Sequence, residues 1–598
     1  MATKTYAVDF ETYYDNELSV TVQGAVNYAR HTQIYMVSIY GPGVEYVGDV
    51  EKAPWEEIAG CHWVSHNAGF DQAVFNAAKE KDQVQEGYEI FAPLVWDCTA
   101  DLCAYLGIPR SLANAVKEVF GITLDKAMRG TAKGKHWPED FTPEQQTKMA
   151  EYGLRDAKYC WQLWEDLSPQ WLESERLISR ITRQRAHQGV LVDRAELVKD
   201  IERLEEVKTS SLRNIPWYAE TGVVRSTKKI AEYCLTSNIP VPVSTAEKSE
   251  EAEVWIEQYG NAHPIIGALR DYSKANRLQR IVEGMLDRIM PNGRMNFGLK
   301  YFGAHTGRWS GTDGLNMQNP NKEPKYGVDI RARIVSAPGK KFIIGDLAQI
   351  EPRCTAWLVN DCPMLKALRD GFGIYEAFAK GSGLWIGEAG TMKKTDKDLY
   401  ALAKAQVLAL GYGAGAAKFI LMAKIYCDLD LSLDAAKEIV TGYRIRNWRV
   451  TNEWGRLEGD MRLSQRKGLP SHVITLPSGR ELTYSRLEYK GEGKDGLKLP
   501  FKVLHAHPGR DKRHEVYWGG KLFENVVQAT ARDVLAYVIL NLEGAGIPVL
   551  WSAHDEVICE VPQDFDTNCV KTIMTQTPPW LEGLVLDAEV IESQHYLK

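Results

Sequence analysis

Two adjacent acids stand between short apolar runs in the stretch WSAHDEVICE, which occupies residues 551–560. Apolar residues on both sides of a polar centre predict a hairpin of two buried strands, with Asp555 and Glu556 at its tip. A hairpin of this kind presents carboxylates to a metal ion while its strands stay buried. Taken alone, the same pattern is typical of an exposed hairpin tip with no further role.

A second stretch far upstream gives the hairpin its significance. Residues 342–351 read FIIGDLAQIE, an apolar strand that ends at Asp346 and is followed by helical spacing. Two strand-end aspartates from distant segments, Asp346 and Asp555, can together hold two divalent ions. Ions about 3.5–4 Å apart clamp the attacking and leaving oxygens of an in-line phosphoryl transfer. At these two stretches the sequence resembles the family A DNA polymerases, whose motifs A and C have this form.

Length and composition indicate a soluble protein of several domains. The chain has 598 residues, 44% hydrophobic and 25% charged, which predicts three or four domains. No signal peptide precedes the first strand pattern, and the most apolar window, residues 405–423, predicts a buried helix rather than a membrane span. Ten cysteines without a CxxC pair favour a reduced, cytoplasmic protein without structural zinc.

The formal net charge of −7 argues only weakly against nucleic acid as a partner, because acids that hold metal ions contribute to it. Local charge is more informative. The segment LRDYSKANRLQR at residues 269–280 carries basic side chains at helical spacing. A solvated helix face is the alternative. In the family a similar segment of the thumb grips the duplex backbone, which implies DNA contacts for Arg270, Lys274 and Arg277.

The first third of the chain carries three further motifs. Each could be presented by one strand or one helix: Asp9 with Glu11 in TYAVDFET, Asn67 with Asp71 in WVSHNAGFD, and Tyr152 with Asp156 in EYGLRD. Each motif also has a structural explanation, as surface acids, a helix-capping asparagine or a core tyrosine. The ordered set is much harder to obtain by accident.

This set resembles the DEDDy class of 3′–5′ exonucleases, an α/β domain with a mixed central sheet. The resemblance implies that Asp9, Glu11, Asp71 and Asp156 hold two Mg²⁺ or Mn²⁺ ions, which are hard cations that prefer oxygen ligands. One ion would lower the pKa of its bound water and the second would stabilise the departing 3′-oxygen. Tyr152 would orient the attacking water.

Two neighbouring loops resemble another family A motif, T-G-R-x-S followed by N-x-Q-N-P. They read GAHTGRWSG at residues 303–311 and LNMQNP at residues 315–320. The resemblance implies that Arg308 tests base-pair geometry through minor-groove acceptors, with Gln318 and Asn319 as supporting contacts. A glycine-rich and asparagine-rich loop without such a role is the alternative.

Residues 404–415, KAQVLALGYGAG, resemble motif B, the fingers helix over the incoming nucleotide. Lys404 would bind the triphosphate and protonate the pyrophosphate leaving group, and Tyr412 would stack near the templating base. Their spacing of slightly more than two turns lets both face one cleft. A buried alanine-rich helix with one snorkelling lysine is the alternative.

The same segment departs from the family at two positions. Tyr400 stands where an arginine is usual, with Lys393, Lys394 and Lys397 as nearby sources of positive charge. Leu408 stands where bacterial members carry an aromatic residue that governs sugar discrimination. The family's triphosphate contact and its sensitivity to dideoxynucleotides therefore cannot be assigned to this chain from the resemblance.

The resemblance assigns the remaining roles of the polymerase site. Asp346, Asp555 and the backbone carbonyl of Leu347 would ligate metal, while Glu556 supports them from nearby. Glu351 would exclude a ribose 2′-hydroxyl. The further contacts are Gln349 and Leu408 to the nucleotide, His554 to the primer terminus, and Gln528, in NVVQATARD at residues 525–533, to the template.

The implied fold class is multidomain α/β and α+β, an RNase H-like exonuclease domain followed by a right-hand polymerase. The expected boundaries are exonuclease 1–168, thumb 169–292, first part of the palm 293–358, fingers 359–450, and second part of the palm with motif C 451–598. The implied activity is template-directed DNA polymerisation with 3′–5′ proofreading. It would use primer–template DNA, deoxynucleoside triphosphates and two Mg²⁺ per active site, with Mn²⁺ able to substitute.

A compact bacteriophage replicative enzyme without the 5′-nuclease domain is the expected type, working in the host cytoplasm and away from membranes, with other replisome proteins as further partners. Two other classes stay open: a nuclease that keeps a polymerase fold to grip DNA, and a non-catalytic DNA-binding scaffold. The sequence does not decide processivity, fidelity, oligomeric state or a preference for a modified nucleotide such as 2-aminoadenine.

Overall fold

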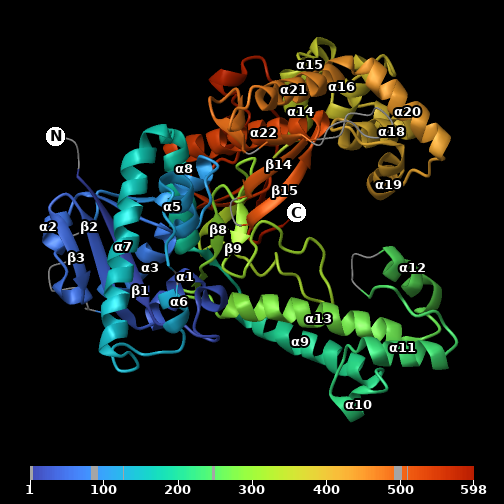
Figure 1. Cartoon of the computed structure of the whole chain (residues 1–598). Coiled ribbons are helices and arrows are strands. Elements are labelled where there is room, and N and C mark those ends of the chain that lie inside the picture. Colours follow the sequence, from blue (N-terminus) through green and yellow to red (C-terminus); the bar gives the residue numbers. More distant parts are fainter. Residues whose placement is uncertain are drawn as a thin grey trace.

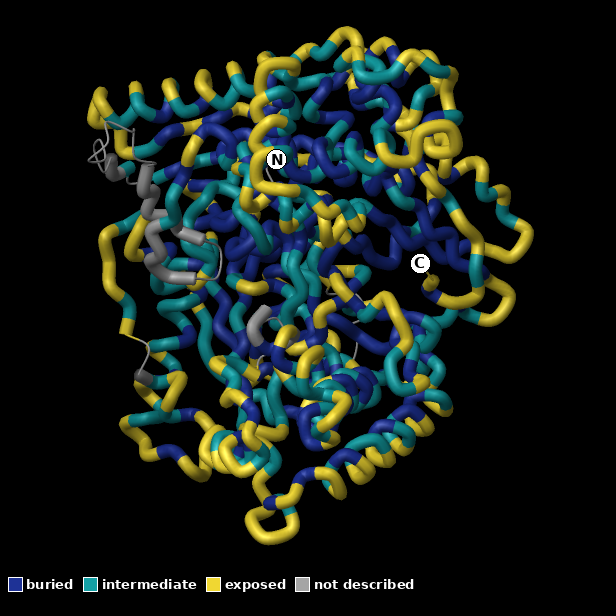
Figure 2. The backbone as a smooth tube through the Cα atoms, turned by 90° about the vertical axis from the view of Figure 1, so that its right-hand side faces the viewer, coloured by how far each residue is buried: buried dark blue, intermediate teal, exposed yellow. Residues whose placement is uncertain are grey.

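The computed structural model describes residues 4–81, 92–125, 127–245, 250–485, 487–489, 501–507 and 510–597. In Figure 1 the N-terminal part forms a lobe on the left, two long helices extend below the centre, and a helical lobe lies above it. Figure 2 shows buried residues inside these lobes and exposed residues along their outer turns. The mixture of sheet and helical regions is the predicted multidomain class.

A mixed five-stranded sheet, in the order β3-β2-β1-β4-β5, forms the N-terminal lobe. Strand β1 runs antiparallel to β2 and parallel to β4. The strands are β1 (Thr5–Thr12), β2 (Ile34–Gly41), β3 (Val44–Gly48), β4 (His62–Ser65) and β5 (Val95–Cys98). The helices are α1 (Val20–His31), α2 (Trp55–Ile58), α3 (Ala68–Glu80), α4 (Thr99–Tyr105), α5 (Leu112–Phe120), α6 (Ala127–Thr131) and α7 (Pro143–Leu167).

Helix α7 lies close to this sheet because a glycine faces it. A Cβ atom added at Gly153 would lie 2.6 Å from the Oγ of Ser38 on β2. A capping box between Thr142 and Gln145 fixes where the helix begins. The close approach brings Tyr152 and Asp156 to the edge of β1.

Helix α8 (Glu173–Gln188) joins the N-terminal lobe to the rest of the chain. Its Arg180 forms an ion pair with the buried Asp97, with Nε and Oδ1 2.7 Å apart. The same helix packs against β16 and α22 of the central region. The sequence assigns α8 to a helical thumb, and in the structure this helix contacts β5 and α3 of the N-terminal lobe as well as the central region.

The region expected to be the thumb is built on two long helices that pack along each other, α9 (Arg194–Arg213) and α13 (Pro264–Leu286) (Figure 1). Asp193 caps α9 by accepting a hydrogen bond of 3.0 Å from the N–H of Glu196. Leu204 and Val282 belong to the buried apolar stripe between the two helices. The helices α10 (Tyr218–Thr221), α11 (Thr227–Thr236) and α12 (Glu250–Tyr259) complete the region.

The central sheet is antiparallel, in the order β16-β17-β10-β18. The predicted hairpin is present as β16 (Val549–Ala553) and β17 (Glu556–Pro562). Strand β10 (Lys340–Leu347) pairs with β17 on one side and with β18 (Ala588–Ser593) on the other. The long helix α22 (Gly519–Gly544) is buried over most of its length, and α23 (Asn568–Met574) packs on β10 and β18.

Smaller strands and the fingers helices complete the described chain. The strands are β6 (Val190–Leu191), β7 (Arg294–Met295), β8 (Gly298–Lys300), β9 (Ser310–Thr312), β11 (Ser471–Thr475), β12 (Glu481–Ser485), β13 (Leu487–Tyr489), β14 (Phe501–His507) and β15 (Arg510–Tyr517). The helices are α14 (Ile350–Leu358), α15 (Cys362–Arg369), α16 (Ile374–Gly381), α17 (Met392–Thr395), α18 (Lys397–Ala409), α19 (Ala416–Cys427), α20 (Leu433–Arg446) and α21 (Trp448–Arg466). Across the described ranges, no helix combines the length and apolar character of a membrane span.

A buried ionic cluster ties α8 to the central region. Arg532 of α22, only 1% exposed, pairs with Glu175 of α8 and, at 3.3 Å, with Asp533. Asp533 in turn binds Arg480, with Nε 2.9 Å from Oδ1. Although burial opposes ionisation, the Arg532 guanidinium lowers the pKa of Glu175. The cluster is therefore charged and internally paired.

Removing one member should be costly, because its partner would remain as an unpaired buried charge. We expect Arg532→Ala to lower the free energy of unfolding by about 3–5 kcal/mol in urea denaturation. Arg456→Ala breaks exposed ion pairs with Glu453 and Asp460 and should cost no more than about 1 kcal/mol. Adding Glu175→Ala to Arg532→Ala should recover part of the loss. A cost for Arg532→Ala as small as that of the control would contradict this view of the cluster.

Candidate catalytic centres

The central sheet brings together the two aspartates expected to hold metal. Asp346 occupies the penultimate position of β10, directly opposite Glu556 at the start of β17. Asp555 lies in the turn just before β17, and its backbone carbonyl accepts a 3.1 Å hydrogen bond from the N–H of Leu347. The ends of motifs A and C are thus adjacent through backbone pairing.

Both turns that carry these residues contain a non-glycine residue in the left-handed region. Gln349 has φ of 44° and His554 has φ of 56°. Such conformations cost free energy and are maintained only where the surroundings fix them. The side chain of Gln318 supplies part of this support: it donates to the carbonyl of Ser552 and accepts from the N–H of His554 at 3.1 Å. Gln318 is buried, and its side chain stabilises the hairpin. Its contact with DNA stays a prediction.

Arg308 lies between the predicted sugar gate and the metal site. Its guanidinium forms an ion pair with Glu351 and lies 3.7 Å from Oδ1 of Asp555. The hydroxyl of Tyr412 donates a 3.1 Å hydrogen bond to the other carboxylate oxygen of Glu351. Although burial opposes the charged form, Glu351 and Asp555 raise the pKa of Arg308. Arg308 and Tyr412, from two distant segments, therefore meet at the carboxylate of Glu351.

The loop that presents Arg308 is held by two buried arginines that the sequence analysis did not identify. Arg480 donates to the carbonyl of Thr306 at 2.9 Å, and Arg532 donates to the carbonyl of Gly307 at 2.9 Å. Gly307 has φ of 88°, a conformation that favours glycine. The only sequence signal was an Arg-Asp pair, 532–533, in a mostly apolar part of the helix after Gln528.

The motif B segment is helical over a shorter range than expected. Helix α18 ends at Ala409, and Tyr412 follows in a turn between Gly411 and Gly413. The two glycines interrupt the helical spacing that predicted Lys404 and Tyr412 on one face. Tyr412 still faces the site through Glu351, and Lys404 is partly exposed one turn before the partly exposed Leu408.

The lysines near Tyr400 that could replace the usual arginine lie on the surface. The ring of Tyr400 packs edge-on against Tyr375 at 5.6 Å. Lys393, Lys394 and Lys397 are all exposed. Their availability for the triphosphate stays a prediction.

The N-terminal lobe collects the second set of acids around β1. Asp9 and Glu11 both project from this strand, and Asp71 of α3 accepts a 3.0 Å hydrogen bond from the N–H of Phe10 between them. Burial raises the pKa of Asp9, and the neighbouring charges of Glu11 and Asp156 raise it further. Burial, followed by Asp156 and Asp71, raises the pKa of Glu11 to about 8. The acids are thus close enough to repel one another.

Helix α7 adds the last two members of this set. Burial raises the pKa of Tyr152, and the charges of Asp156, Glu11 and Asp9 raise it further, which places its hydroxyl among the acids. Arg129 is the cation that opposes the shifts of Asp9 and Glu11. The structure therefore brings all five predicted exonuclease residues together.

These acids fit divalent cations by their chemistry. Buried like charges with one opposing cation are unfavourable, and bound Mg²⁺ or Mn²⁺ would relieve the repulsion. Within the described residues, no three His, Cys, Asp or Glu side chains already stand in the arrangement of a metal site.

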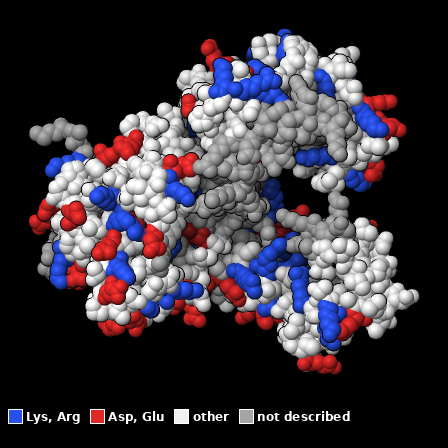
Figure 3. Space-filling model, in the orientation of Figure 1, with Lys and Arg blue, Asp and Glu red and all other residues white. Residues whose placement is uncertain are grey.

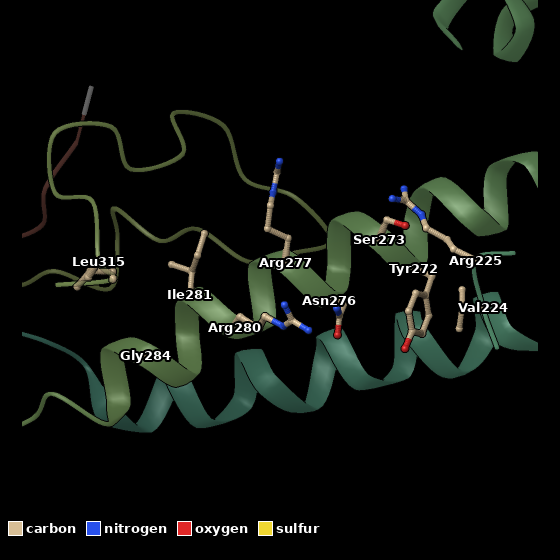
Figure 4. Close-up of a pocket in the computed structure, with 11 residues that line it drawn as sticks. Val224, Arg225, Tyr272, Ser273, Asn276, Arg277, Arg280, Ile281, Gly284 and Leu315 are labelled. Carbon is tan, nitrogen blue, oxygen red and sulfur yellow. The ribbon is translucent and has the colours of Figure 1, made fainter. Parts of the chain in front are cut away.

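A basic groove runs along thumb helix α13 (Figure 4). Arg277 and Arg280 line it together with Ser273 and Asn276, and Arg225 faces them from the loop before α11. Figure 3 shows Lys and Arg side chains gathered along this helix, beside the open space below the fingers. Of the predicted thumb contacts, Arg277 lies in the groove, whereas Arg270 and Lys274 are not among its lining residues.

Two other predicted DNA contacts are accessible to different extents. Asn319 is exposed in the loop after β9. Gln528 is partly exposed on α22, where its amide donates to Glu524 at 3.2 Å. Their contacts with DNA stay predictions.

The chain matches the family model of DNA polymerase family A over residues 195–454. The DNA polymerase of Bacillus phage SP02 is 24% identical over 88% of this chain and 89% of its own length. DNA polymerase I of Chloroflexus aurantiacus is 26% identical over 52% of this chain and 30% of its own length. The thermostable DNA polymerase I of Thermus filiformis is 25% identical over 69% of this chain and 47% of its own length. The chain therefore spans less than half the length of both bacterial relatives.

Among solved structures, the POL domain of Pol1 from M. smegmatis, in complex with DNA primer-template and dNTP, aligns with a TM-score of 0.67. The alignment covers 100% of this chain and 96% of that one at 18% identity, a level at which the likeness establishes the fold. The matched family range contains Asp346, Arg308 and Lys404. Residues 195–454 therefore match a family A DNA polymerase domain, and the fold of the whole chain is similar to that of a polymerase domain.

Proposed function

We propose that the protein is a template-directed DNA-dependent DNA polymerase with its own 3′–5′ proofreading exonuclease, and that both reactions use two divalent metal ions. The observation that carries the proposal is the presence of two separate carboxylate sets, one at the end of β10 and one around β1. A DNA-binding scaffold would have no use for buried like charges of this kind.

At the polymerase centre, each neighbouring group has a defined part. Asp346, Asp555 and the carbonyl of Leu347 would hold Mg²⁺, which supplies charge neutralisation and a lowered pKa for the primer 3′-hydroxyl. Lys404 binds the triphosphate, with Gln349 and Leu408 beside the nucleotide. Glu351 excludes a 2′-hydroxyl where Arg308 and Tyr412 hold its carboxylate.

The nucleic acid would run from the thumb groove to the palm. Arg277, with Arg270 and Lys274 on the same helix, neutralises backbone phosphates. Arg308 reads minor-groove acceptors at the primer end, where every base pair offers one. His554, Gln318, Asn319 and Gln528 supply the remaining contacts to primer and template.

At the exonuclease centre, Asp9, Glu11, Asp71 and Asp156 would hold Mg²⁺ or Mn²⁺, which generates a nucleophilic hydroxide and stabilises the leaving 3′-oxygen. The high pKa of Tyr152 keeps its hydroxyl protonated, so it can donate to and orient the attacking water. Arg129 lies near enough to balance the phosphate charge.

Several finer assignments belong to the same proposal. The domain boundaries at residues 168, 292, 358 and 450 follow the sequence motifs. The match to the phage SP02 polymerase over 89% of its length supports replication of a phage genome in the host cytoplasm. Accessory replisome proteins are the further expected partners.

The two activities should be separable by substitution. Asp346→Ala or Asp555→Ala should reduce primer extension by about 10³-fold or more, because metal ions contribute several kcal/mol to the transition state. Primer shortening by the same variants should persist. The double variant Asp9→Asn, Glu11→Gln should lose primer shortening and keep primer extension. The measurement is a gel assay of a 5′-labelled primer, and undiminished extension by Asp346→Ala would refute the metal assignment.

Glu351→Ala should reduce discrimination against ribonucleotides by about tenfold or more, because the space for a 2′-hydroxyl is opened. Glu351→Gln is the matched control, since it keeps the size of the side chain and removes the charge that binds Arg308. It should retain most of the discrimination. The readout is the ratio of kcat/KM for deoxynucleotide and ribonucleotide insertion. Equal discrimination by Glu351→Ala and the parent would exclude the gate role.

The metal-free exonuclease centre should weaken the protein as pH rises. Because the pKa of Glu11 is raised from 4.5 to about 8, the folded state binds more protons than the unfolded state between these values, and stability falls across this window. In EDTA at pH 8, the double variant Asp9→Asn, Glu11→Gln should therefore have a Tm about 2–4 °C higher than that of the parent. Its Tm should also depend less on pH. Mg²⁺ should stabilise the parent more than the double variant, in which only the polymerase centre is left to bind the ion. Identical pH profiles would contradict the buried like charges.

A further inference from the structure

The corner between fingers helices α20 and α21 carries an exposed basic and aromatic patch that the functions above do not use. The sequence across the corner is RIRNWR, residues 444–449. Arg444 and Arg446 are exposed, Ile445 is 70% exposed and Trp448 is 51% exposed. Figure 1 places both helices in the upper, helical lobe. We call these six residues the corner patch.

Buried residues on either side of the bend fix the shape of the corner patch. Tyr443 is buried and stacks on Phe378, with ring centroids 6.0 Å apart, and Val450 is buried on the other side of the bend. Asn447 ends one helix and begins the next, and both its backbone N–H and its amide donate to the carbonyl of Tyr443, at 2.8 and 3.0 Å. The exposed side chains therefore stand on a rigid turn.

The charges of the corner patch are not neutralised. Other cations on these two helices have acidic partners: Lys437 pairs with Asp434 at 3.1 Å and Arg456 with Glu453 at 2.6 Å. Among the described residues, Arg444, Arg446 and Arg449 form no ion pair with an acid. For Arg444 and Arg446 the positions three and four residues away hold no acid. Three positive charges thus gather on a chain whose net charge is −7.

The aromatic ring adds a second recognition element. The Arg449 guanidinium lies over the Trp448 ring at 4.6 Å. An exposed Trp beside unpaired Arg residues is the combination that binds single-stranded nucleic acid, because bases stack on the ring while cations follow the phosphates. A protein partner would also use Trp and Arg, but one exposed aliphatic residue gives it little apolar area.

The corner patch lies at the start of a helix that contacts the segment before Tyr412. On α21, Trp454 donates from Nε1 to the carbonyl of Gly411 at 3.1 Å, and Gly411 precedes Tyr412. Trp448 lies six residues before Trp454, about 9 Å along the helix axis. A template strand that leaves the region of Tyr412 can therefore reach the corner within a few nucleotides.

We propose that the corner patch binds the single-stranded template ahead of the polymerase centre, with one base stacked on Trp448 and phosphates bound by Arg444, Arg446 and Arg449. This inference rests on the proposed function, which supplies the primer–template. It adds a binding surface outside the catalytic cleft.

The test measures equilibrium binding of the full-length protein to a fluorescent primer–template in EDTA, which prevents chemistry. One duplex carries a template overhang of about 2 nucleotides and the other an overhang of about 12, within the range that single-strand binding surfaces cover. The parent should bind the long overhang more tightly. Trp448→Ala should weaken only that binding, by about five- to hundredfold, and Trp448→Phe should retain most of it.

A salt titration tests the arginines separately. Replacing Arg444, Arg446 and Arg449 by Gln should lower the slope of log Kd against log salt by about 2 on the long overhang, since each contact with a single strand contributes about 0.7. Lys437→Gln and Arg456→Gln, which remove paired cations from the same helices, should leave the slope unchanged.

The outcomes separate this inference from the proposed function. Equal loss on both overhangs, or unchanged binding by the corner variants, would overturn it and leave the patch to an acidic protein partner. Tight binding of both duplexes without any gain from the long overhang would also overturn it while leaving the polymerase assignment intact. If the parent bound neither duplex, the proposed function itself would fail, and a single-stranded oligonucleotide alone would then test the dependence on Trp448.

Discussion

Carboxylates of like charge have to be held side by side at two places in this chain, and the backbone is what holds them. In the central sheet, pairing between β10 and β17 sets Asp346 opposite Glu556, and one backbone hydrogen bond joins Leu347 to Asp555. In the N-terminal lobe, β1 supplies two acids while α3 and α7 bring the others to it. Side-chain repulsion is thus opposed by strand pairing and helix packing, which do not depend on a bound ion.

Arginines provide the second level of organisation around the polymerase centre. Arg308 pairs with Glu351 and approaches Asp555, so the proposed sugar gate and one proposed metal ligand share a single cation. Arg480 and Arg532 hold the carbonyls of the two residues before Arg308, and Glu175 and Asp533 neutralise them in the interior. Because Glu175 lies on α8, which contacts the N-terminal lobe, one polar network extends from that helix to the loop that carries Arg308.

The sequence was most informative where a motif lies within one element. Alternation and an acid at the end of a strand predicted β10 and the β16–β17 hairpin, and the spacing of Tyr152 and Asp156 predicted one face of α7. It was less informative about the extent of the motif B helix, since the effect of Gly411 and Gly413 on its end depends on packing against Trp454. The roles of Arg480 and Arg532 could not be predicted, because their partners are carbonyls and acids brought together from four separate segments.

The most direct test of two catalytic centres in one chain is a 5′-labelled primer annealed to a longer template, incubated with the full-length protein and Mg²⁺ on a denaturing gel. The account predicts extension to the template end when deoxynucleotides are present and stepwise shortening when they are absent. Shortening in both conditions, or extension without any shortening, would contradict it, because one of the two carboxylate sets would then have no catalytic role.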